Sequence, residues 1–152
     1  MTTIAWDGNM LAADSQSTNS GLPRQATKIW KIKNDLLFGC AGDIQDGIAV
    51  KDWLEVQRGD RPKVDDNFSG LLIRQINEIV PNYKGPKISY EVYKLENKLI
   101  QIPVKEKQVS IGSGRDFAIA AMRLNCDAAV AVSIAIEFDV YSGGLIDVLT
   151  FD

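Results

Sequence analysis

The stretch Thr2-Thr3-Ile4-Ala5-Trp6-Asp7-Gly8-Asn9-Met10 decides how this chain begins to fold. Residues 3–6 have the composition of a short strand. The Asp7-Gly8-Asn9 segment predicts a hairpin turn, because an Asp-Gly pair tolerates the positive φ that such turns require. Residues 10–15 form the return strand. The sequence therefore predicts an N-terminal β-hairpin with Thr2 at its start.

Beyond this hairpin, groups of strands are followed by groups of helices. Such grouping predicts an α+β fold rather than alternating βαβ units. We expect one domain over residues 1–152, with two packed sheets and a pair of helices outside each. The expected elements are a polar loop with Asn19, Ser20, Gly21 and Pro23; a hairpin over residues 28–32 and 36–40; helices over 43–57 and 66–80; strands over 88–93, 98–102 and 109–111; helices over 116–124 and 128–137; and a closing strand over 145–150.

The helix expected over residues 66–80 follows from an apolar period, with a cap at Asp65 or Asp66 and an end at Pro81. Together with the helix over 43–57, it carries apolar residues beyond a narrow stripe, namely Val50, Val56 and Ile73. These residues either form a surface for self-association or widen the face that packs on the core.

Composition excludes several classes of chemistry. The 152 residues contain 17 Lys plus Arg, 20 Asp plus Glu and no histidine, so the formal charge is −3 and no Ser-His-Asp triad, Cys-His pair or imidazole metal site can form. The two cysteines, Cys40 and Cys126, lie too far apart for a C-x-x-C redox pair. Acid–base chemistry must therefore use carboxylates, lysines, tyrosines or the α-amine of the chain.

The same composition bears on partners and location. The mild acidity argues against a nucleic-acid partner, which usually needs a basic face. No apolar run approaches the ~20 residues of a membrane span, so we expect no membrane partner. The first residues have neither the basic nor the apolar region of a signal peptide. A cytoplasmic location is the resulting expectation.

The N-terminus offers a nucleophile that needs no histidine. Removal of Met1 would leave Thr2 with a hydroxyl and a free α-amine, whose ordinary pKa of about 7.7–8.0 lets it accept a proton near neutral pH. A threonine that uses its own amine as base is an established nucleophile arrangement. Taken alone, however, Met-Thr-Thr is also an ordinary way for a chain to begin.

Further segments give these first residues a context. They are Ala12-Ala13-Asp14-Ser15-Gln16-Ser17-Thr18, Lys28, Gly39-Cys40-Ala41-Gly42-Asp43, Ile111-Gly112-Ser113-Gly114, Asp139-x-x-Ser142 and Gly143-Gly144. By their order and spacing, over nearly the whole chain, the sequence resembles the proteasome β-subunit and HslV family of N-terminal-nucleophile hydrolases. The Ala-Asp-Ser-x-x-Thr form is more like a proteasome β-subunit. The small size is more like HslV or compact proteasome-like proteins of bacteria and phages.

The resemblance implies a four-layer αββα sandwich and assigns three roles near the nucleophile Thr2. Lys28 would lie beside Thr2 and lower the pKa of its hydroxyl and amine. Asp14 would hold Lys28 charged and oriented. Gly39 would offer its N–H to the oxyanion of the tetrahedral intermediate. From local sequence alone, these residues could equally be an exposed carboxylate, a solvated lysine and a strand-end glycine.

The resemblance also implies a second group around the terminal amine, made by Ser113, Asp139 and Ser142. Such groups would hydrogen-bond the amine and relay a proton. Locally, Gly-Ser-Gly is a common loop before a helix, and Asp139 could be a turn or cap residue. The Gly112-x-Gly114 pair does not open a βαβ unit, so we discard a nucleotide site.

The function implied is a threonine endopeptidase subunit of a self-compartmentalising protease that degrades unfolded polypeptides. The resemblance further implies a homo-oligomeric ring, an ATP-dependent unfoldase as a possible partner, and no cofactor or metal. The substrate would lie extended beside Thr18 and Ala41, held by backbone hydrogen bonds. Two alternatives stay open: an inactive assembly protein that retains Met1, and a small-molecule amidase of the same superfamily.

Overall fold

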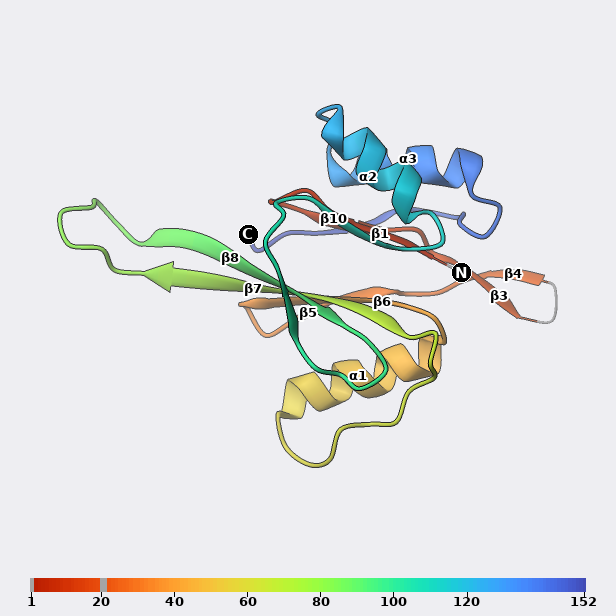
Figure 1. The fold of residues 1–152 in the computed structure, drawn as a ribbon, viewed down its shortest axis with the longest axis horizontal. Helices are drawn as coiled ribbons and strands as arrows, with labels where there is room; N and C mark the ends of the chain where they lie inside the picture. The colour runs from red at the N-terminus through yellow and green to blue at the C-terminus, as the bar shows by residue number, and fades with distance from the viewer. Residues whose placement is uncertain (1, 20–21) are drawn as a thin grey trace.

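The computed structural model describes residues 2–19 and 22–152 and stacks them in four layers. Figure 1 shows helices α2 and α3 over one sheet, a second sheet beneath it, and helix α1 on the far side. This order confirms the predicted αββα sandwich. One outer layer differs from the prediction, because α1 covers the second sheet without a helical partner.

The first sheet contains the N-terminal hairpin and has the order β10-β1-β2-β11. Asp7 fixes its turn, since the Asp7 carboxylate accepts hydrogen bonds from the N–H groups of Asn9 and Met10 at 2.8 and 2.9 Å. Gly8 takes a positive φ of 101° there, as the sequence predicts. All neighbours are antiparallel, and the strands are β1 (Thr3–Trp6), β2 (Leu11–Ala13), β10 (Val109–Gly112) and β11 (Asp147–Leu149).

The second sheet is antiparallel with the order β5-β6-β7-β8-β9. Its outer part projects, because β7 and β8 continue as a two-stranded ribbon beyond the other strands (Figure 1). Its strands are β5 (Ile29–Ile32), β6 (Leu36–Ala41), β7 (Ser69–Glu78), β8 (Lys87–Leu95) and β9 (Ile102–Val104).

The helices begin at the aspartates that the sequence suggests. Asp43 caps α1 (Ile44–Val56) by accepting from the Gln45 N–H, and Asp127 caps α3 (Ala128–Phe138) by accepting from the Val130 N–H. Helix α2 (Arg115–Arg123) packs with α3 through alanines, which allow close approach to the first sheet. Within residues 2–19 and 22–152, no helix has the length and apolarity needed to cross a bilayer.

The prediction of a helix over residues 66–80 is wrong, because residues Ser69–Glu78 form strand β7. Leu71, Leu72 and Ile73 are consecutive and fully buried. Leu71 and Ile73 face the core between the sheets, while Leu72 faces the core under α1. A strand buried on both faces is a continuous apolar run, which periodicity cannot distinguish from a buried helix.

Smaller differences occur elsewhere. The expected polar loop contains strands β3 (Gln16–Asn19) and β4 (Leu22–Gln25), which pair with each other, while Ser20 and Gly21 lie outside the described residues. The strand expected over 98–102 begins only at Ile102, and the closing strand is shorter than expected. Val50 and Ile73 are fully buried, so of the three residues considered for self-association only Val56, 63% exposed, reaches the surface.

Candidate active site

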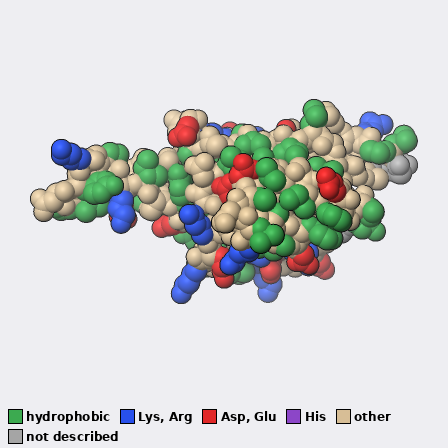
Figure 2. Space-filling model, turned by 90° about the horizontal axis from the view of Figure 1, so that it is seen from above, with side chains coloured by type: hydrophobic (Ala, Val, Ile, Leu, Met, Phe, Trp, Pro, Cys, Tyr) green, Lys and Arg blue, Asp and Glu red, His purple; other side chains and the backbone are tan. Residues whose placement is uncertain are grey.

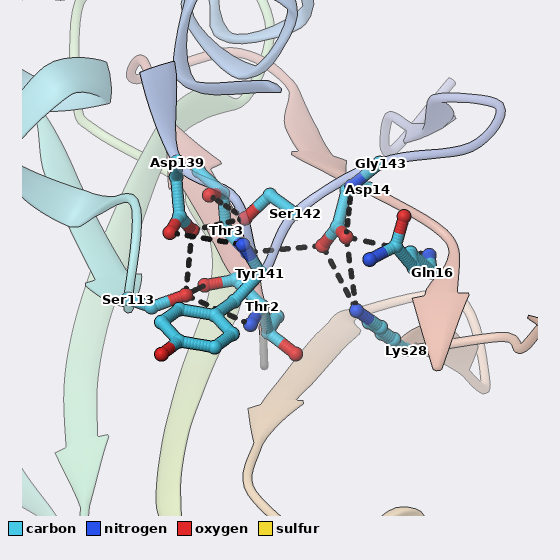
Figure 3. Close-up of polar contacts among 10 residues, drawn as sticks. All are labelled: Thr2, Thr3, Asp14, Gln16, Lys28, Ser113, Asp139, Tyr141, Ser142 and Gly143. Atoms are coloured by element: carbon cyan, nitrogen blue, oxygen red, sulfur yellow. Dashed lines mark hydrogen bonds and ion pairs between the residues drawn. The ribbon is translucent and has the colours of Figure 1, made fainter. Parts of the chain in front are cut away.

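Six of the seven predicted site residues converge where the first hairpin meets the loops before α2 and after α3. Figure 3 shows Thr2 between Ser113 on one side and Lys28 on the other. Segments distant in the chain supply these side chains. They are Thr2, Asp14, Lys28, Ser113, Asp139 and Ser142.

Asp14 and Lys28 form a buried ion pair, which we call the charged cluster. The Lys28 Nζ lies 3.0 and 3.1 Å from the two Asp14 carboxylate oxygens. The carboxylate also accepts from the N–H groups of Thr3 (2.9 Å), Gln16 (3.3 Å) and Gly143 (3.0 Å). Asp14 is fully buried, so these donors replace the water that a buried carboxylate loses.

The same burial changes the pKa of the Lys28 ammonium. Removal from water lowers the pKa of Lys28, and attraction and hydrogen bonding by Asp14 oppose that shift. A lysine held in this way presents a positive charge next to Thr2 and gives up its proton more readily than an exposed lysine does.

Ser113, Asp139 and Ser142 form a second group, the hydroxyl cluster. Both serine Oγ atoms lie 2.6 Å from the same Asp139 oxygen, Oδ2. Because an ionised carboxylate only accepts, both hydroxyls donate to it. The Ser113 Oγ is then an acceptor for the Thr2 N–H at 3.3 Å, and the Ser142 Oγ for the Thr3 hydroxyl at 2.7 Å.

These donors determine the charge of Asp139. Burial alone would raise the pKa of Asp139, but hydrogen bonds from Ser113, Ser142 and the Tyr141 N–H outweigh it and lower the pKa. The carboxylate therefore stays ionised at neutral pH. Through Ser113 it orients a hydrogen-bond acceptor toward the nitrogen of Thr2.

Thr3 is a site residue that the sequence reasoning missed. Its N–H donates to Asp14 in the charged cluster, and its hydroxyl donates to Ser142 in the hydroxyl cluster. Thr3 is fully buried at the start of β1, directly after Thr2. A buried threonine beside the proposed nucleophile was the available signal, because a buried hydroxyl needs a partner.

The structure contradicts the role predicted for Gly39. This residue lies inside β6, opposite Ile29 on β5 and Leu71 on β7, so its backbone belongs to the sheet. A Cβ at this position would meet Ile29 Cγ2 at 2.9 Å and Ile4 Cδ1 at 3.1 Å. Gly39 is therefore a glycine of the core, required by close side-chain packing rather than by a substrate.

Gly42, missed by the sequence reasoning, lies where Gly39 was expected. It follows the end of β6, takes a φ of 117°, and lines the same cavity as Thr2. None of the hydrogen bonds among residues 2–19 and 22–152 uses its N–H. The available signal was the Ala41-Gly42-Asp43 segment, where a strand ends at a glycine just before a helix cap.

Gly112 and Gly114 allow the chain to pass close to Thr2 and Thr3. Gly112 has a φ of 97°, and a Cβ there would collide with the carbonyl of Thr2. A Cβ at Gly114 would collide with the Thr3 hydroxyl oxygen. The Gly-Ser-Gly segment is thus a close-approach loop whose glycines bring Ser113 within hydrogen-bonding distance of Thr2.

Thr2 borders a cavity of about 300 Å³ that lies between the open ends of the two sheets. Gly42, Ser113, Lys94 and Arg115 are among the residues that line it. Thr2 itself is 3% exposed. Thr18, expected beside the substrate, is an exposed residue of β3 and does not line the cavity, whereas Ala41 lines it as expected.

Two other features bear on alternative chemistry. Burial raises the pKa of Cys40 to about 12, so its thiol is protonated at neutral pH, and the side chain packs in the core under α1. Within the described part of the chain, no three Cys, Asp or Glu side chains gather as a metal site would need. Of the two carboxylates at the site, Asp14 forms an ion pair with Lys28, and Asp139 accepts hydrogen bonds from the hydroxyls of Ser113 and Ser142.

Comparison with known proteins identifies the fold. The crystal structure of eukaryotic HslV from Trypanosoma brucei matches with a TM-score of 0.64 and 23% identity, over 97% of this chain and 97% of that chain. The chain therefore has the fold of HslV, which confirms the predicted N-terminal-nucleophile hydrolase fold. No protein-family model and no curated protein matches the sequence.

Proposed function

We propose that this chain is a threonine endopeptidase of the proteasome and HslV type, with Thr2 as N-terminal nucleophile once Met1 is removed. The observation that carries the proposal is the placement of Thr2 between the charged cluster and the hydroxyl cluster. The N–H of Thr2 donates a hydrogen bond to the Ser113 Oγ of the hydroxyl cluster. The fold shared with HslV supports it. Met1 lies outside the described residues.

The mechanism follows from this arrangement. Removal of Met1 converts the nitrogen of Thr2 into an α-amine, which accepts the hydroxyl proton as Oγ attacks the substrate carbonyl. Collapse of the tetrahedral intermediate expels the amine half of the peptide, which takes that proton. An ester remains on Thr2, and water hydrolyses it to regenerate the hydroxyl.

The surrounding residues have separate tasks in this scheme. The Lys28 ammonium lowers the pKa of the Thr2 hydroxyl, and Asp14 positions Lys28. The hydroxyl cluster orients the α-amine through Ser113. We assign the oxyanion donor to the N–H of Gly42, which borders the cavity, in place of Gly39; such a donor contributes about 3–4 kcal/mol in the transition state.

The decisive experiment replaces Thr2. Thr2→Ala removes the attacking oxygen, so we expect hydrolysis of an unfolded protein substrate to be abolished while the circular dichroism spectrum is unchanged. Thr2→Ser is the matched control and should retain hydrolysis. Intact mass spectrometry establishes whether Met1 is absent, and a peptide epoxyketone or boronate should modify the processed wild type but not Thr2→Ala. Hydrolysis by Thr2→Ala would contradict the proposal. A wild type that retains Met1 and is inert would favour an assembly protein.

We further propose that copies of the chain form a cytoplasmic ring, which would confine an unselective peptidase. An apolar surface over α2 and α3 supports this, with Phe117 and Phe138 stacked at 5.6 Å and both exposed. Figure 2 shows hydrophobic side chains gathered on this face. Light scattering after size-exclusion chromatography should find a large oligomer. A stable monomer at micromolar concentration would refute the ring and leave an ATP-dependent unfoldase no ring to dock on.

A further inference from the structure

The cavity beside Thr2 is positively charged, although the chain as a whole is acidic. Lys94 and Arg115 both line it, and no Asp or Glu is among its lining residues. The formal charge of the whole chain is −3. A cationic cavity in an acidic protein is a local feature that average composition does not explain.

Lys94 is directed into the cavity by the register of the second sheet. It lies opposite Leu71, and directly paired residues place their side chains on the same face. Leu71 belongs to the core between the two sheets. Lys94 therefore points into the space between the sheets, where they open toward Thr2. Among residues 2–19 and 22–152, no carboxylate forms an ion pair with it.

Arg115 reaches the cavity from the side of the first sheet, just beyond the end of β10. It is the first residue of α2, and its Nη1 donates to the Gly112 carbonyl at 3.0 Å. That hydrogen bond holds the guanidinium next to the loop that contacts Thr2. Its only ion pair within the described part of the chain is to Asp116 at 3.9 Å, where both side chains are mostly exposed, so this contact neutralises little of its charge.

The other groups around the cavity are neutral. Asn67 and Ser69 supply polar side chains and Ile111 supplies an apolar wall. The acidic residues Glu106 and Asp116 line an adjoining cavity of about 420 Å³, which shares Lys94 and Arg115. The two cations thus stand at the border between the two cavities, with their charge unopposed on the side of Thr2.

We propose that this cavity binds a carboxylate of the polypeptide substrate next to the bond that Thr2 cleaves, so that Lys94 and Arg115 make cleavage selective for acidic residues. The proposal rests on the peptidase function proposed above. The carboxylate is either an Asp or Glu side chain or the C-terminus of the peptide. Arg and Lys both suit a carboxylate, and Arg can bind it with two parallel hydrogen bonds.

The first test compares fluorogenic peptides that differ only by Glu or Gln at one position near the cleaved bond. We expect the wild type to cleave one Glu peptide with a kcat/KM about tenfold higher than its Gln counterpart, and the difference to shrink at high salt. C-terminal amidation distinguishes the two carboxylate sources. It should lower kcat/KM about tenfold if the terminal carboxylate is bound, and leave the Glu-over-Gln preference unchanged if a side chain is bound.

Charge reversal provides the internal check. Lys94→Glu combined with Arg115→Glu should reverse the preference toward a Lys peptide, and Lys94→Gln with Arg115→Gln should remove it even if the reversed pair folds poorly. Lys87→Glu is the matched control, because Lys87 lies on the same strand at its exposed, distant end. This control should leave the wild-type preference unchanged.

A binding assay separates this proposal from the peptidase proposal. Fluorescence anisotropy with Thr2→Ala protein measures peptide affinity without turnover, and the Glu peptide should bind about tenfold more tightly than the Gln peptide. If this preference holds while no variant cleaves peptide, the peptidase function fails and the carboxylate site stands. Equal treatment of Glu and Gln peptides, together with equal treatment of free and amidated C-termini, in both assays would overturn the carboxylate site.

Discussion

The charged cluster and the hydroxyl cluster each hold a buried carboxylate beside Thr2, but they stabilise it in different ways. Asp14 faces a cation, Lys28, and three backbone N–H groups. Asp139 faces two serine hydroxyls and one backbone N–H, and among the described residues no cationic side chain donates a hydrogen bond to it. The first cluster therefore sets an electric charge next to Thr2, whereas the second sets the direction of hydrogen bonds.

This difference predicts how much unfolding free energy a substitution in each cluster costs. Removing one member of a buried ion pair leaves an uncompensated charge, which costs about 3–5 kcal/mol of unfolding free energy. Weakening a hydroxyl network costs less, because each hydrogen bond to a charged group contributes about 1.5–3 kcal/mol and part of it survives in a neutral amide. Variants of the two clusters should therefore differ in both stability and kinetics.

The largest effect is expected from Lys28→Ala. It removes the charge that acts on the Thr2 hydroxyl, so kcat should fall on the order of 10³-fold while KM changes little. Lys28→Arg should not rescue kcat, because a guanidinium differs in shape and does not give up a proton. Steady-state kinetics on a peptide substrate measures both values.

The same variant needs a control for stability, because Asp14 would be left unpaired. Lys28→Met combined with Asp14→Asn removes both charges, so its unfolding free energy should recover toward wild type while kcat stays low. Recovery of kcat in this pair would show that Lys28 acts only through folding. A change confined to KM in Lys28→Ala would likewise contradict its role on Thr2.

An intermediate effect is expected from Gly112→Ala, which tests whether Thr2 must lie between the clusters. The added Cβ would collide with the Thr2 carbonyl, and a displacement of that size can cost about 100-fold in rate. Gly85→Ala is the matched control, because Gly85 has a similar φ of 93° but open space around its Cβ. Both should lose about 1–2 kcal/mol from backbone strain, whereas only Gly112→Ala should lose activity. Equal activity in the two variants would argue against the close approach.

The smallest effect is expected from Asp139→Asn, which keeps the shape of the hydroxyl cluster and removes its charge. We expect about a tenfold loss of kcat and a loss of about 1–2 kcal/mol in unfolding free energy at pH 6. Because folding lowers the pKa of Asp139, its contribution is fully present above the unfolded value and fades as the pH falls below about 4.

Denaturant unfolding of both proteins at pH 6 and pH 3 measures this. The stability difference between wild type and Asp139→Asn should be largest at pH 6 and shrink at pH 3. A difference that grew toward pH 3 would mean that the Asp139 carboxyl is protonated in the folded protein. In that case the assigned direction of the Ser113 and Ser142 hydroxyls would be wrong.

Sequence alone was informative where local chemistry decides local structure. The Asp7-Gly8 turn, the caps at Asp43 and Asp127, and the α+β order were predicted because each depends on neighbours in the chain. The absence of histidine by itself excludes imidazole chemistry. The positions of Thr2, Asp14 and Lys28 were predicted through a family resemblance, and the structure brings Asp14 and Lys28 together as an ion pair.

Only the tertiary structure decided the remaining features, because each depends on what packs from a distant segment. Residues 69–78 form a strand since both of their faces are covered, which no local period reveals. Gly39 and Gly42 are both glycines near the end of β6, and only the packing of Ile4 and Ile29 distinguishes the core glycine from the one beside the cavity. Likewise, Lys94 comes from the second sheet and Arg115 from helix α2 over the first sheet, and they share a cavity only after the sandwich closes.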